Sequence, residues 1–262
     1  MNRDTTILAL VIALAVLTES SEAQDGLKLA QTPAVGFGAT VGLGVMYAPR
    51  YLGASESRMH ALPLVQVRWG ENWSAGVDGI GYKAGLRPGW QVGLRLGWDR
   101  GRDESDAAAL RGMGNIPARA ELAATSSLRL LPFLVVGTGL RYGSGADRNG
   151  LVADISLRSV VPIADRVRVM FGVSGQWANH ASMQSLFGVT EGQSAASGYS
   201  VYVPGSGWFD VGSQLTVTTD LGQGWQMMAR LDQRRLLGNA GRSPLVQDKL
   251  STSGALMMMW RY

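Results

Sequence analysis

The two histidines of this 262-residue chain are the first place to look for catalysis. His180 lies in the run Asn179-His180-Ala181-Ser182. A hydrolase uses these residue types as a nucleophile (serine), a base that takes its proton (histidine) and a polar group that orients the base. A barrel hydrolase needs such groups together on an outward-facing strand, and neither His60 nor His180 falls in a predicted strand. The chain also lacks a Gly-x-Ser-x-Gly turn. We therefore predict ordinary loop histidines and no catalytic residues.

A second chemical candidate is a group of four carboxylates around the end of one predicted strand: Asp99, Asp103, Glu104 and Asp106. Oxygen ligands of this kind suit calcium. Three arginines are interleaved with them, however: Arg100, Arg102 and Arg111. Ion pairing inside a folded loop therefore explains the cluster better than a metal site. The chain has no cysteine, which excludes disulfides and thiolate ligands, and we expect neither metal nor cofactor.

Composition separates the chain from nucleic-acid-binding and ordinary soluble proteins. The formal net charge is +4, almost all of the positive charge is arginine, and no basic run with interleaved aromatic residues appears. We therefore expect no nucleic-acid partner. The charged fraction is only 17%, and there are 35 glycines. A membrane barrel explains both values, because its lipid-facing positions are apolar and glycine leaves room in a narrow lumen.

The N-terminal residues have the pattern of an export signal. Arg3 precedes an apolar run over residues 7–17, and Ser21-Glu22-Ala23 forms a small-x-small cleavage pattern. The run is shorter than the roughly 20 residues that a spanning helix requires. We predict that residues 1–23 are a cleaved signal peptide, followed by a short segment over residues 24–33 and a single domain over residues 34–262.

Strict alternation marks the strands and favours a barrel in the outer membrane. At the C-terminus one face of the last strand carries Leu256, Met258, Trp260 and Tyr262. The final strand of an outer-membrane barrel carries an aromatic residue into the interfacial girdle, whereas the edge of a soluble sandwich is the alternative. Residues 90–99 alternate in the same way, with tryptophan at both ends of the apolar face, as two interfacial girdles require. No convincing helical periodicity appears after the signal peptide.

Connection lengths determine the expected strand number. Tight turns alternate with long connections over residues 101–117, 178–206 and 238–250, as a barrel arranges them on the periplasmic and outer sides. If residues 72–86 formed one strand, the total would be eleven, whereas bacterial single-chain barrels have even numbers. Asp78-Gly79 is a type I′ hairpin signal within this stretch. We therefore predict an all-β, antiparallel barrel of twelve strands, with ten as the alternative.

The inward faces of the predicted strands are rich in arginine and carry few carboxylates. This excess of positive charge is compatible with an anion-preferring pore. The alternative is a narrow or occluded lumen filled by arginine–carboxylate pairs, which we favour. The candidate lumen-lining residues are Arg68, Arg95, Arg119, Arg129, Arg141, Arg158, Arg166, Arg168, Arg230 and Arg234.

Four segments carry a family resemblance in order along the chain: residues 47–55 with Leu62-Pro63, residues 101–114, residues 183–198 and residues 235–246. Together they are similar to the MipA/OmpV family of outer-membrane proteins, named for a member that interacts with MltA. The resemblance covers nearly all of residues 34–262. The chain departs from the family pattern at Leu186, where a tyrosine is expected, and at Tyr262, where a phenylalanine is expected.

The resemblance implies a non-enzymatic protein in the outer membrane of a Gram-negative bacterium, surrounded by its lipid. The family's best-described role is that of a scaffold linking a murein lytic transglycosylase with a bifunctional murein synthase. The candidate docking turns lie at residues 87–89, 130–132, 162–165 and 221–224. Two alternatives stay open: a small-solute channel lined by the arginines, and an adhesin that acts through its long outer loops.

Overall fold

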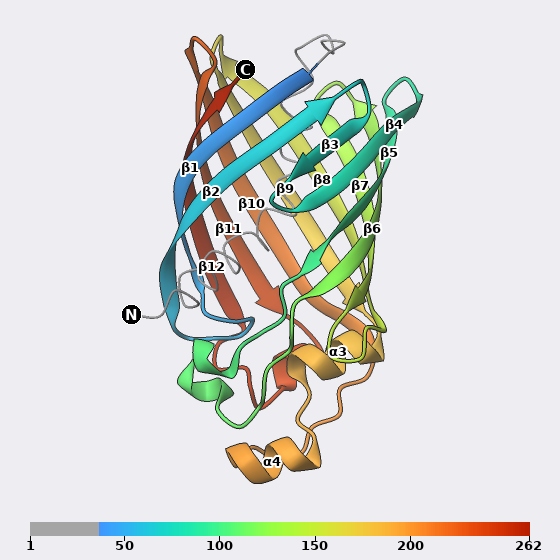
Figure 1. The fold of residues 1–262 in the computed structure, drawn as a ribbon, viewed down its shortest axis with the longest axis vertical. Coiled ribbons are helices and arrows are strands. Elements are labelled where there is room, and N and C mark those ends of the chain that lie inside the picture. Colours follow the sequence, from blue (N-terminus) through green and yellow to red (C-terminus); the bar gives the residue numbers. More distant parts are fainter. Residues whose placement is uncertain (1–36) are drawn as a thin grey trace.

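The computed structural model describes residues 37–262, which form one closed barrel of twelve antiparallel strands (Figure 1). Neighbouring strands in the sequence pair with one another, and the last strand closes the ring against the first. The predicted signal peptide and residues 24–33 lie outside the described residues. The strands are β1 (Phe37–Pro49), β2 (Ser57–Trp69), β3 (Trp73–Gly76), β4 (Gly79–Arg87), β5 (Trp90–Asp99), β6 (Arg119–Leu131), β7 (Leu134–Ser144), β8 (Gly150–Ala164), β9 (Val167–Ala178), β10 (Gly207–Gly222), β11 (Trp225–Leu236) and β12 (Leu250–Arg261).

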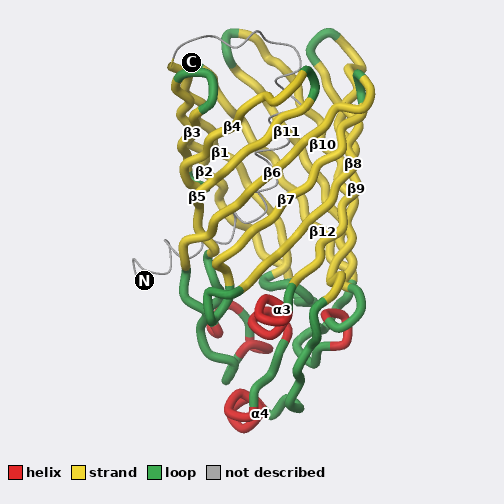
Figure 2. Tube along the Cα trace, turned by 90° about the vertical axis from the view of Figure 1, so that its right-hand side faces the viewer, coloured by secondary structure: helices red, strands yellow, loops and turns green. Residues whose placement is uncertain are grey.

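The two ends of the barrel differ (Figures 1 and 2). The turn end holds the C-terminus and the short connections that follow β2, β4, β6, β8 and β10. The opposite end, the loop end, holds the long connections with α3 (His180–Phe187), α4 (Glu191–Ser197) and the 3-10 helices η2 (Glu104–Asp106), η3 (Ala108–Leu110) and η4 (Ala240–Arg242). Within residues 37–262, no helix has the length and apolar character needed to span a membrane.

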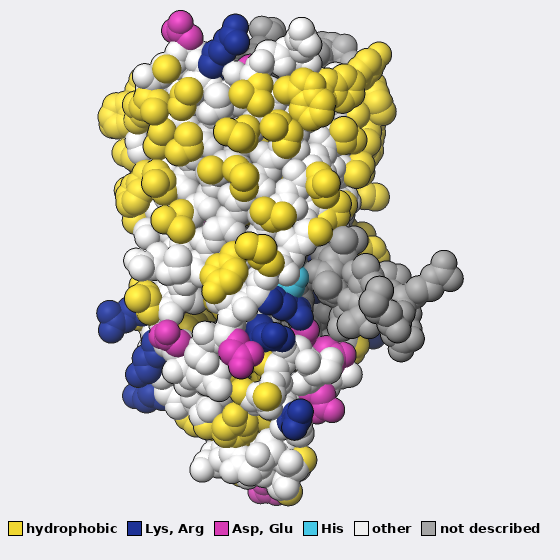
Figure 3. Space-filling view, turned by 90° about the vertical axis from the view of Figure 1, so that its left-hand side faces the viewer, with side chains coloured by type: hydrophobic (Ala, Val, Ile, Leu, Met, Phe, Trp, Pro, Cys, Tyr) yellow, Lys and Arg dark blue, Asp and Glu magenta, His cyan; other side chains and the backbone are white. Residues whose placement is uncertain are grey.

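The strand pattern follows from the alternation of side chains. In β11, Trp225, Met227 and Leu231 are exposed on the outer face, whereas every second residue from Gln226 to Asp232 is buried on the inner face. The outward residues together give the wall an apolar surface, and charged side chains gather near the two ends (Figure 3). A wall with this surface suits lipid, because apolar side chains replace water at the positions that face the hydrocarbon.

The predicted split of residues 72–86 into two strands is confirmed, and with it the total of twelve strands. The predicted type I′ turn is wrong by one residue, because Gly76 pairs with Gly79 and the turn residues are Val77 and Asp78. Gly79 belongs to β4, with φ at 120°. A Cβ atom at Gly79 would collide with the carbonyl oxygen of Leu96, so this glycine lets β4 approach β5 closely.

Two short α-helices occur in the described chain, although the sequence shows no convincing helical periodicity there. Both α3 and α4 begin at a capping side chain: Asn179 accepts a hydrogen bond from the N–H of Ser182, and Thr190 accepts one from that of Gln193. Gln193 in turn accepts from the N–H of Thr190, which completes a capping box. These helices have only eight and seven residues, too few for a clear apolar period, so the capping residues were the available signal.

Removal of residues 260–262 should prevent barrel closure. The deletion takes away the pairings of Trp260 with Val41 and of Arg261 with Thr40, together with the hydrogen bond from the N–H of Tyr262 to the carbonyl oxygen of Ala39. Each unpaired backbone group in lipid costs several kcal/mol, so a few of them together cost about as much as the free energy of unfolding of a whole domain. We expect loss of the heat-modifiable folded band on gels, whereas Tyr262→Phe should keep it. A normal folded band from the truncated chain would contradict the assignment.

Candidate functional site: an arginine-lined lumen and a loop cap

A cavity of about 130 Å³ lies inside the barrel. It is lined by inward side chains from β2 to β11, among them serines, glutamines and charged groups of both signs. The glycines of β7 and β9 give the longer side chains room, since a Cβ atom at Gly137 would lie 2.8 Å from the guanidinium of Arg158. The charged lining residues are Asp78, Lys83, Arg95, Arg141, Asp154, Arg158, Asp232 and Arg234.

Ion pairs neutralise part of this lining. Arg95 lies 2.9 Å from Asp78, at the tip of the β3–β4 hairpin. Arg230 donates to both carboxylate oxygens of Asp232, two residues along the same strand, and both side chains are buried. Arg234 pairs with Asp210 of the neighbouring strand at 2.8 Å. Charge-assisted pairs of this kind hold inward side chains in fixed positions across the lumen.

The ten predicted lumen-lining arginines occupy different levels of the barrel. Arg230 is buried in its pair with Asp232. Arg166 was predicted to lie within a strand, but it lies in the turn before β9, which begins at Val167. The cavity is lined by Arg95, Arg141, Arg158 and Arg234. Four others share the inward register nearer the strand ends: Arg68, Arg119, Arg129 and Arg168. A joint role of the ten in a lumen site stays a prediction.

Two features of the lumen were missed from the sequence. The first is Arg261, which has the inward register at the end of β12 and was not among the predicted lumen-lining residues. The second feature is an apolar cluster inside the barrel, which comprises Met46, Ala48, Leu62, Met228, Met257 and Met259. Glycines of β1 make space for it, since a Cβ atom at Gly42 would lie 3.0 Å from Cγ of Met259. Flexible methionine side chains fill such irregular space well.

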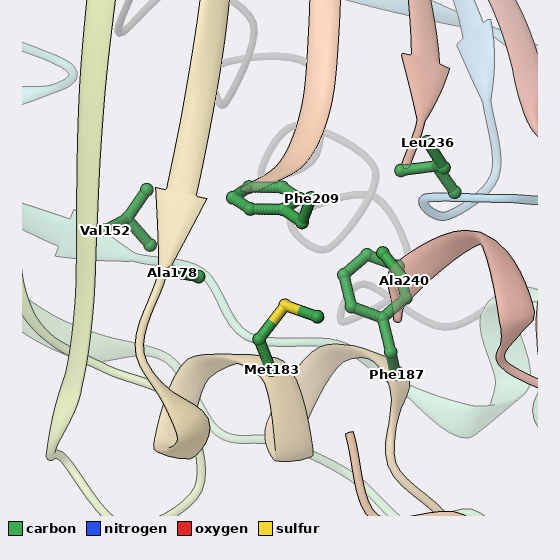
Figure 4. Packing of buried hydrophobic residues seen from close by; sticks show 7 residues of the cluster. All are labelled: Val152, Ala178, Met183, Phe187, Phe209, Leu236 and Ala240. Atoms are coloured by element: carbon green, nitrogen blue, oxygen red, sulfur yellow. The ribbon is translucent and has the colours of Figure 1, made fainter. Parts of the chain in front are cut away.

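The long connections pack together at the loop end and form what we call the loop cap, residues 50–56, 100–118, 145–149, 179–206 and 237–249. Figure 4 shows Met183 and Phe187 of α3 directed toward Phe209, Leu236 and Ala240. Phe187 is fully buried, and its ring centroid lies 6.0 Å from that of Phe209. A second cluster of Met113, Val189 and Leu245 joins three of the connections. The cap therefore has an apolar core of its own.

Hydrogen bonds tie these connections to one another. The side chain of Ser243 donates to the carbonyl oxygen of Phe187 at 2.6 Å, and that of Gln193 donates to the carbonyl oxygen of Met113 at 2.7 Å. The hydroxyl of Tyr51 donates to the carbonyl oxygen of Leu245 at 2.9 Å. Burial of this phenol raises the pKa of Tyr51 to about 12, so it stays protonated and remains a donor. The segments that carry the family resemblance thus contribute to one packed unit.

The predicted acidic cluster stabilises the connection between β5 and β6, and its members have partners beyond those expected. Glu104 accepts the N–H groups of Gly112 and Gly114, and Asp106 pairs with Arg58 at 3.1 Å. The charge of Asp106 also acts on Arg102, one of the three interleaved arginines, whereas pairing with Arg100 and Arg111 stays a prediction. The carboxylates of this cluster thus bind backbone N–H groups and an arginine that is distant in sequence. Asp103 behaves in the same way toward the backbone: hydrogen bonds from Ser105 lower the pKa of its carboxyl. Residues 37–262 contain no group of three potential metal ligands.

The histidines and their neighbours are used structurally. His60 is buried on the inner face of β2 and accepts a 2.9 Å hydrogen bond from Nε of Arg58, so its predicted loop position is wrong. The prediction failed because β2 begins at Ser57, four residues before the predicted strand. His180 opens α3, and its Nδ1 lies 2.8 Å from the carbonyl oxygen of Pro204. Asn179 caps that helix, and the hydroxyl of Ser182 lies 3.4 Å from the carbonyl oxygen of Leu151.

Comparison with known proteins identifies the family. Residues 41–262 match the family described as MltA-interacting protein MipA. The chain belongs to the MipA family. This confirms the resemblance seen in the loop segments, and with the closed barrel it places the protein in the outer membrane of a Gram-negative bacterium. In such barrels the short turns face the periplasm and the long loops face outward, so the turn end is periplasmic and the loop cap is extracellular.

Solved structures share the barrel at low identity. The translocator domain of the autotransporter NalP from Neisseria meningitidis is 14% identical with a TM-score of 0.54, over 96% of this chain and 97% of that one. The KdgM porin is 6% identical with a TM-score of 0.43, over 84% of this chain and 98% of that one. The similarity to the NalP translocator domain shows a shared fold and nothing about function. No curated protein matches the chain.

Phe187→Ala should loosen the loop cap while the strands of the barrel stay folded and paired. The substitution removes a fully buried ring from the cluster around α3, and such truncations cost about 3–5 kcal/mol. We expect faster proteolysis and faster hydrogen exchange across residues 179–206, with an unchanged heat-modifiable band. Val203→Ala, at a side chain that is 66% exposed, is the control. Equal protection in both variants would contradict a packed cap.

Asp232→Ala should destabilise the barrel more than removal of the whole ion pair. The single substitution leaves the buried guanidinium of Arg230 without its carboxylate, which costs about 3–5 kcal/mol. In Arg230→Met/Asp232→Leu neither charge is buried, and most of the stability should return. Urea unfolding in detergent micelles measures both variants. A double variant as unstable as the single one would show that the pair acts mainly through packing.

Proposed function

We propose that the protein is a non-enzymatic scaffold that docks murein enzymes at the periplasmic face of the outer membrane. The partners are a lytic transglycosylase, consistent with the family description as an MltA-interacting protein, and a bifunctional murein synthase. The observation that carries this proposal is the asymmetry of the two ends. A packed loop cap covers the extracellular end, whereas the periplasmic end presents short turns held by paired strands.

Short turns on a closed barrel make a suitable docking surface because they are already fixed before a partner arrives. Each turn connects two strands that are paired up to their ends, as Leu131 with Leu134 and Gly222 with Trp225 show. Binding to a preorganised surface costs little ordering of the chain, which leaves more of the contact energy for affinity. The observed turns at residues 88–89, 132–133, 165–166 and 223–224 lie at or beside the four predicted docking turns.

The second candidate is a channel, which the charged cavity favours. Arg141 and Arg158 line it, as do Arg95 and Arg234. Against a strongly anion-selective pore, Arg95 and Arg234 are paired with Asp78 and Asp210. The packed cap also lies at the extracellular end of any conduction path. The scaffold therefore accounts for more of the described features than the channel does.

Exchange of the four periplasmic turns should abolish partner binding. We expect a variant in which residues 88–89, 132–133, 165–166 and 223–224 are all replaced by Asn-Gly to lose co-purification of the transglycosylase from mild-detergent envelope extracts. The control is Val201→Ser/Val203→Ser at exposed residues of the loop cap, which should keep the partner. Both proteins must show the heat-modifiable band. Retention of the transglycosylase by the turn variant would refute docking at these turns.

Planar-bilayer recording tests the channel. The scaffold with its packed cap predicts no steady current from the purified barrel, apart from brief openings. Phe187→Ala should increase those openings, because it loosens the cap. A steady, anion-selective conductance of the unchanged protein would contradict the scaffold with a closed outer end and favour the channel.

A further inference from the structure

One part of the barrel wall is not closed by strand pairing. The β3–β4 hairpin pairs with β2 only from Gln66 to Trp69, so it extends only part of the way from the turn end toward the loop end (Figure 1). Nearer the loop end, residues 57–64 of β2 pair with β1 alone, and residues 97–99 of β5 pair with β6 alone. Paired strands lie about 4.8 Å apart, whereas nearly all Cα atoms of β2 are more than 8 Å from those of β5. We call residues 57–64 the free edge.

The backbone of the free edge lacks hydrogen-bond partners among the described residues. The carbonyl oxygen of Val65 accepts the N–H of Val77, which shows the side of β2 that faces the hairpin. The hydrogen-bonding groups of successive residues in a strand point to opposite edges. Those of Met59, Ala61 and Pro63 therefore point to the same side as those of Val65, where no strand pairs with them. Pro63 has no N–H to leave unpaired, and proline within a sheet is typical of an edge.

The free edge lies in the part of the wall that faces the outer leaflet. It forms the half of β2 that is nearer the extracellular loop cap. The outward side chains around it are apolar: Met59 is 76% exposed, and Trp98 of β5 is 63% exposed. Val45, the register partner of Ala61 on β1, is exposed as well. The medium that reaches the free edge from outside is therefore lipid.

The inner face of β2 changes from polar to apolar along the free edge. Arg58 and His60 lie nearest the loop cap and are joined by a 2.9 Å hydrogen bond. Leu62 and Leu64 follow on the same face, toward the middle of the barrel, and belong to the apolar methionine cluster or pack against it. Beside the hairpin, at Gln66, the inner face is polar again. The order along the free edge matches that of the headgroup and the acyl chain in an outer-leaflet lipid.

Glycines of β1 bring the methionines next to the free edge. Gly42 pairs with Leu64 of β2 and with Met259 of β12. A Cβ atom on Gly42 would lie 3.4 Å from Cβ of Leu64 and 3.0 Å from Cγ of Met259, so the two side chains flank this glycine. Methionine side chains are flexible and adapt to the shape of an apolar ligand. Leu64 and Val77 pack against the cluster and are only half-buried, which leaves part of each side chain for a further contact.

We propose that one acyl chain of an outer-leaflet lipid inserts between β2 and β5 and packs against the methionine cluster. Leu62 and Leu64 contact the chain, while the headgroup stays at the level of Arg58 and His60, beside the loop cap. The chain covers an apolar face that otherwise borders the water of the lumen, and removal of apolar surface from water is favourable. This lipid site is separate from the periplasmic docking turns, and its test does not depend on theirs.

The unpaired backbone groups suit this occupant at each depth. Pro63 is the deepest of the three residues, and hydrocarbon beside it leaves only a carbonyl group without a partner, since it has no N–H. Met59 and Ala61 lie closer to the level of the headgroup. Ester carbonyl groups and interfacial water supply hydrogen-bond partners there. The loss of a donor at Pro63 is thus where hydrocarbon would leave one unsatisfied.

A second copy of the chain suits the free edge less well. Two barrels in one membrane have the same orientation, so both β2 strands run from the loop end toward the periplasm. Their free edges cannot form the antiparallel pairing that the strands of the barrel use. Because barrel strands tilt by about 35–45°, facing strands of two such barrels cross one another instead of pairing. Lipid remains the occupant that the position of the free edge favours.

Photolabelling of the unchanged protein tests the site. The full barrel is placed in nanodiscs of phosphatidylcholine that carries a diazirine in one acyl chain, and attached lipid is mapped by mass spectrometry after irradiation. We expect attachment at Leu62 and Leu64 on the inner face as well as at Met59 on the outer face. Ser127 and Ser156, on the inner faces of β6 and β8, should carry none. Attachment confined to outward side chains would overturn the proposal.

A polar variant tests whether the apolar inner face holds the chain. Leu62→Gln/Leu64→Gln should lose the lipid attached at Val77 and Met259 but keep that at Met59. The matched control Leu43→Gln/Val45→Gln makes the same kind of change on the outer face of β1 and should keep the inward attachment. Undiminished inward attachment in the first variant would overturn the assignment to this face. If that variant does not fold, the map of the unchanged protein still decides.

A single cysteine distinguishes lipid from a second copy at the free edge. The chain has no cysteine of its own, so Ala61→Cys can form a disulfide only between two barrels. We expect this variant to remain monomeric under oxidising conditions in liposomes of the same phosphatidylcholine. A disulfide-linked dimer, together with loss of inward photolabelling, would assign the free edge to a second copy and overturn the lipid site.

Discussion

The pairing of β12 with β1 is the interaction on which the rest of the structure depends. Hydrocarbon offers no partner for a backbone N–H or C=O group, so a sheet crosses a membrane only as a closed ring. Here the seam joins residues 40–47 of β1 to residues 254–261 of β12. Gly42 and Gly44 allow close packing at this seam, because a Cβ atom on either would press against the backbone of β12. Closure thus explains both the inward glycines of β1 and the methionines beside them.

Once the ring is closed, alternation decides what each face carries. One face of every strand meets lipid and is apolar, and the other meets the lumen and carries arginines, carboxylates and small polar residues. The connections after even-numbered strands are short and lie at the turn end, whereas all the long connections follow odd-numbered strands. Ion pairs such as Arg95–Asp78 hold the middle of the lumen, and the loop cap covers its extracellular end. The polarity of the molecule therefore follows from closure and alternation together.

Much of this architecture was readable in the sequence, because alternation and turn chemistry are local. The twelve strands, the hidden β3–β4 hairpin and the family were all predicted correctly. The failures concern contacts between distant residues. Asp106 binds Arg58, 48 positions away, and His60 is buried by a strand that begins earlier than its alternation indicated. The short helices of the cap were missed because capping by Asn179 and Thr190, rather than an apolar period, defines them.

We propose that the periplasmic turns of the capped barrel present the docking surface for a murein enzyme. Site-specific photo-cross-linking in whole cells tests it most directly, since the chain has no cysteine and single labels are easily placed. Asp165→Cys puts a label in an exposed periplasmic turn, and Ser200→Cys puts one in the extracellular loop cap. If the turns dock the enzyme, the lytic transglycosylase should cross-link to position 165 and not to position 200. A cross-link from position 200 alone, or from neither position, would contradict it.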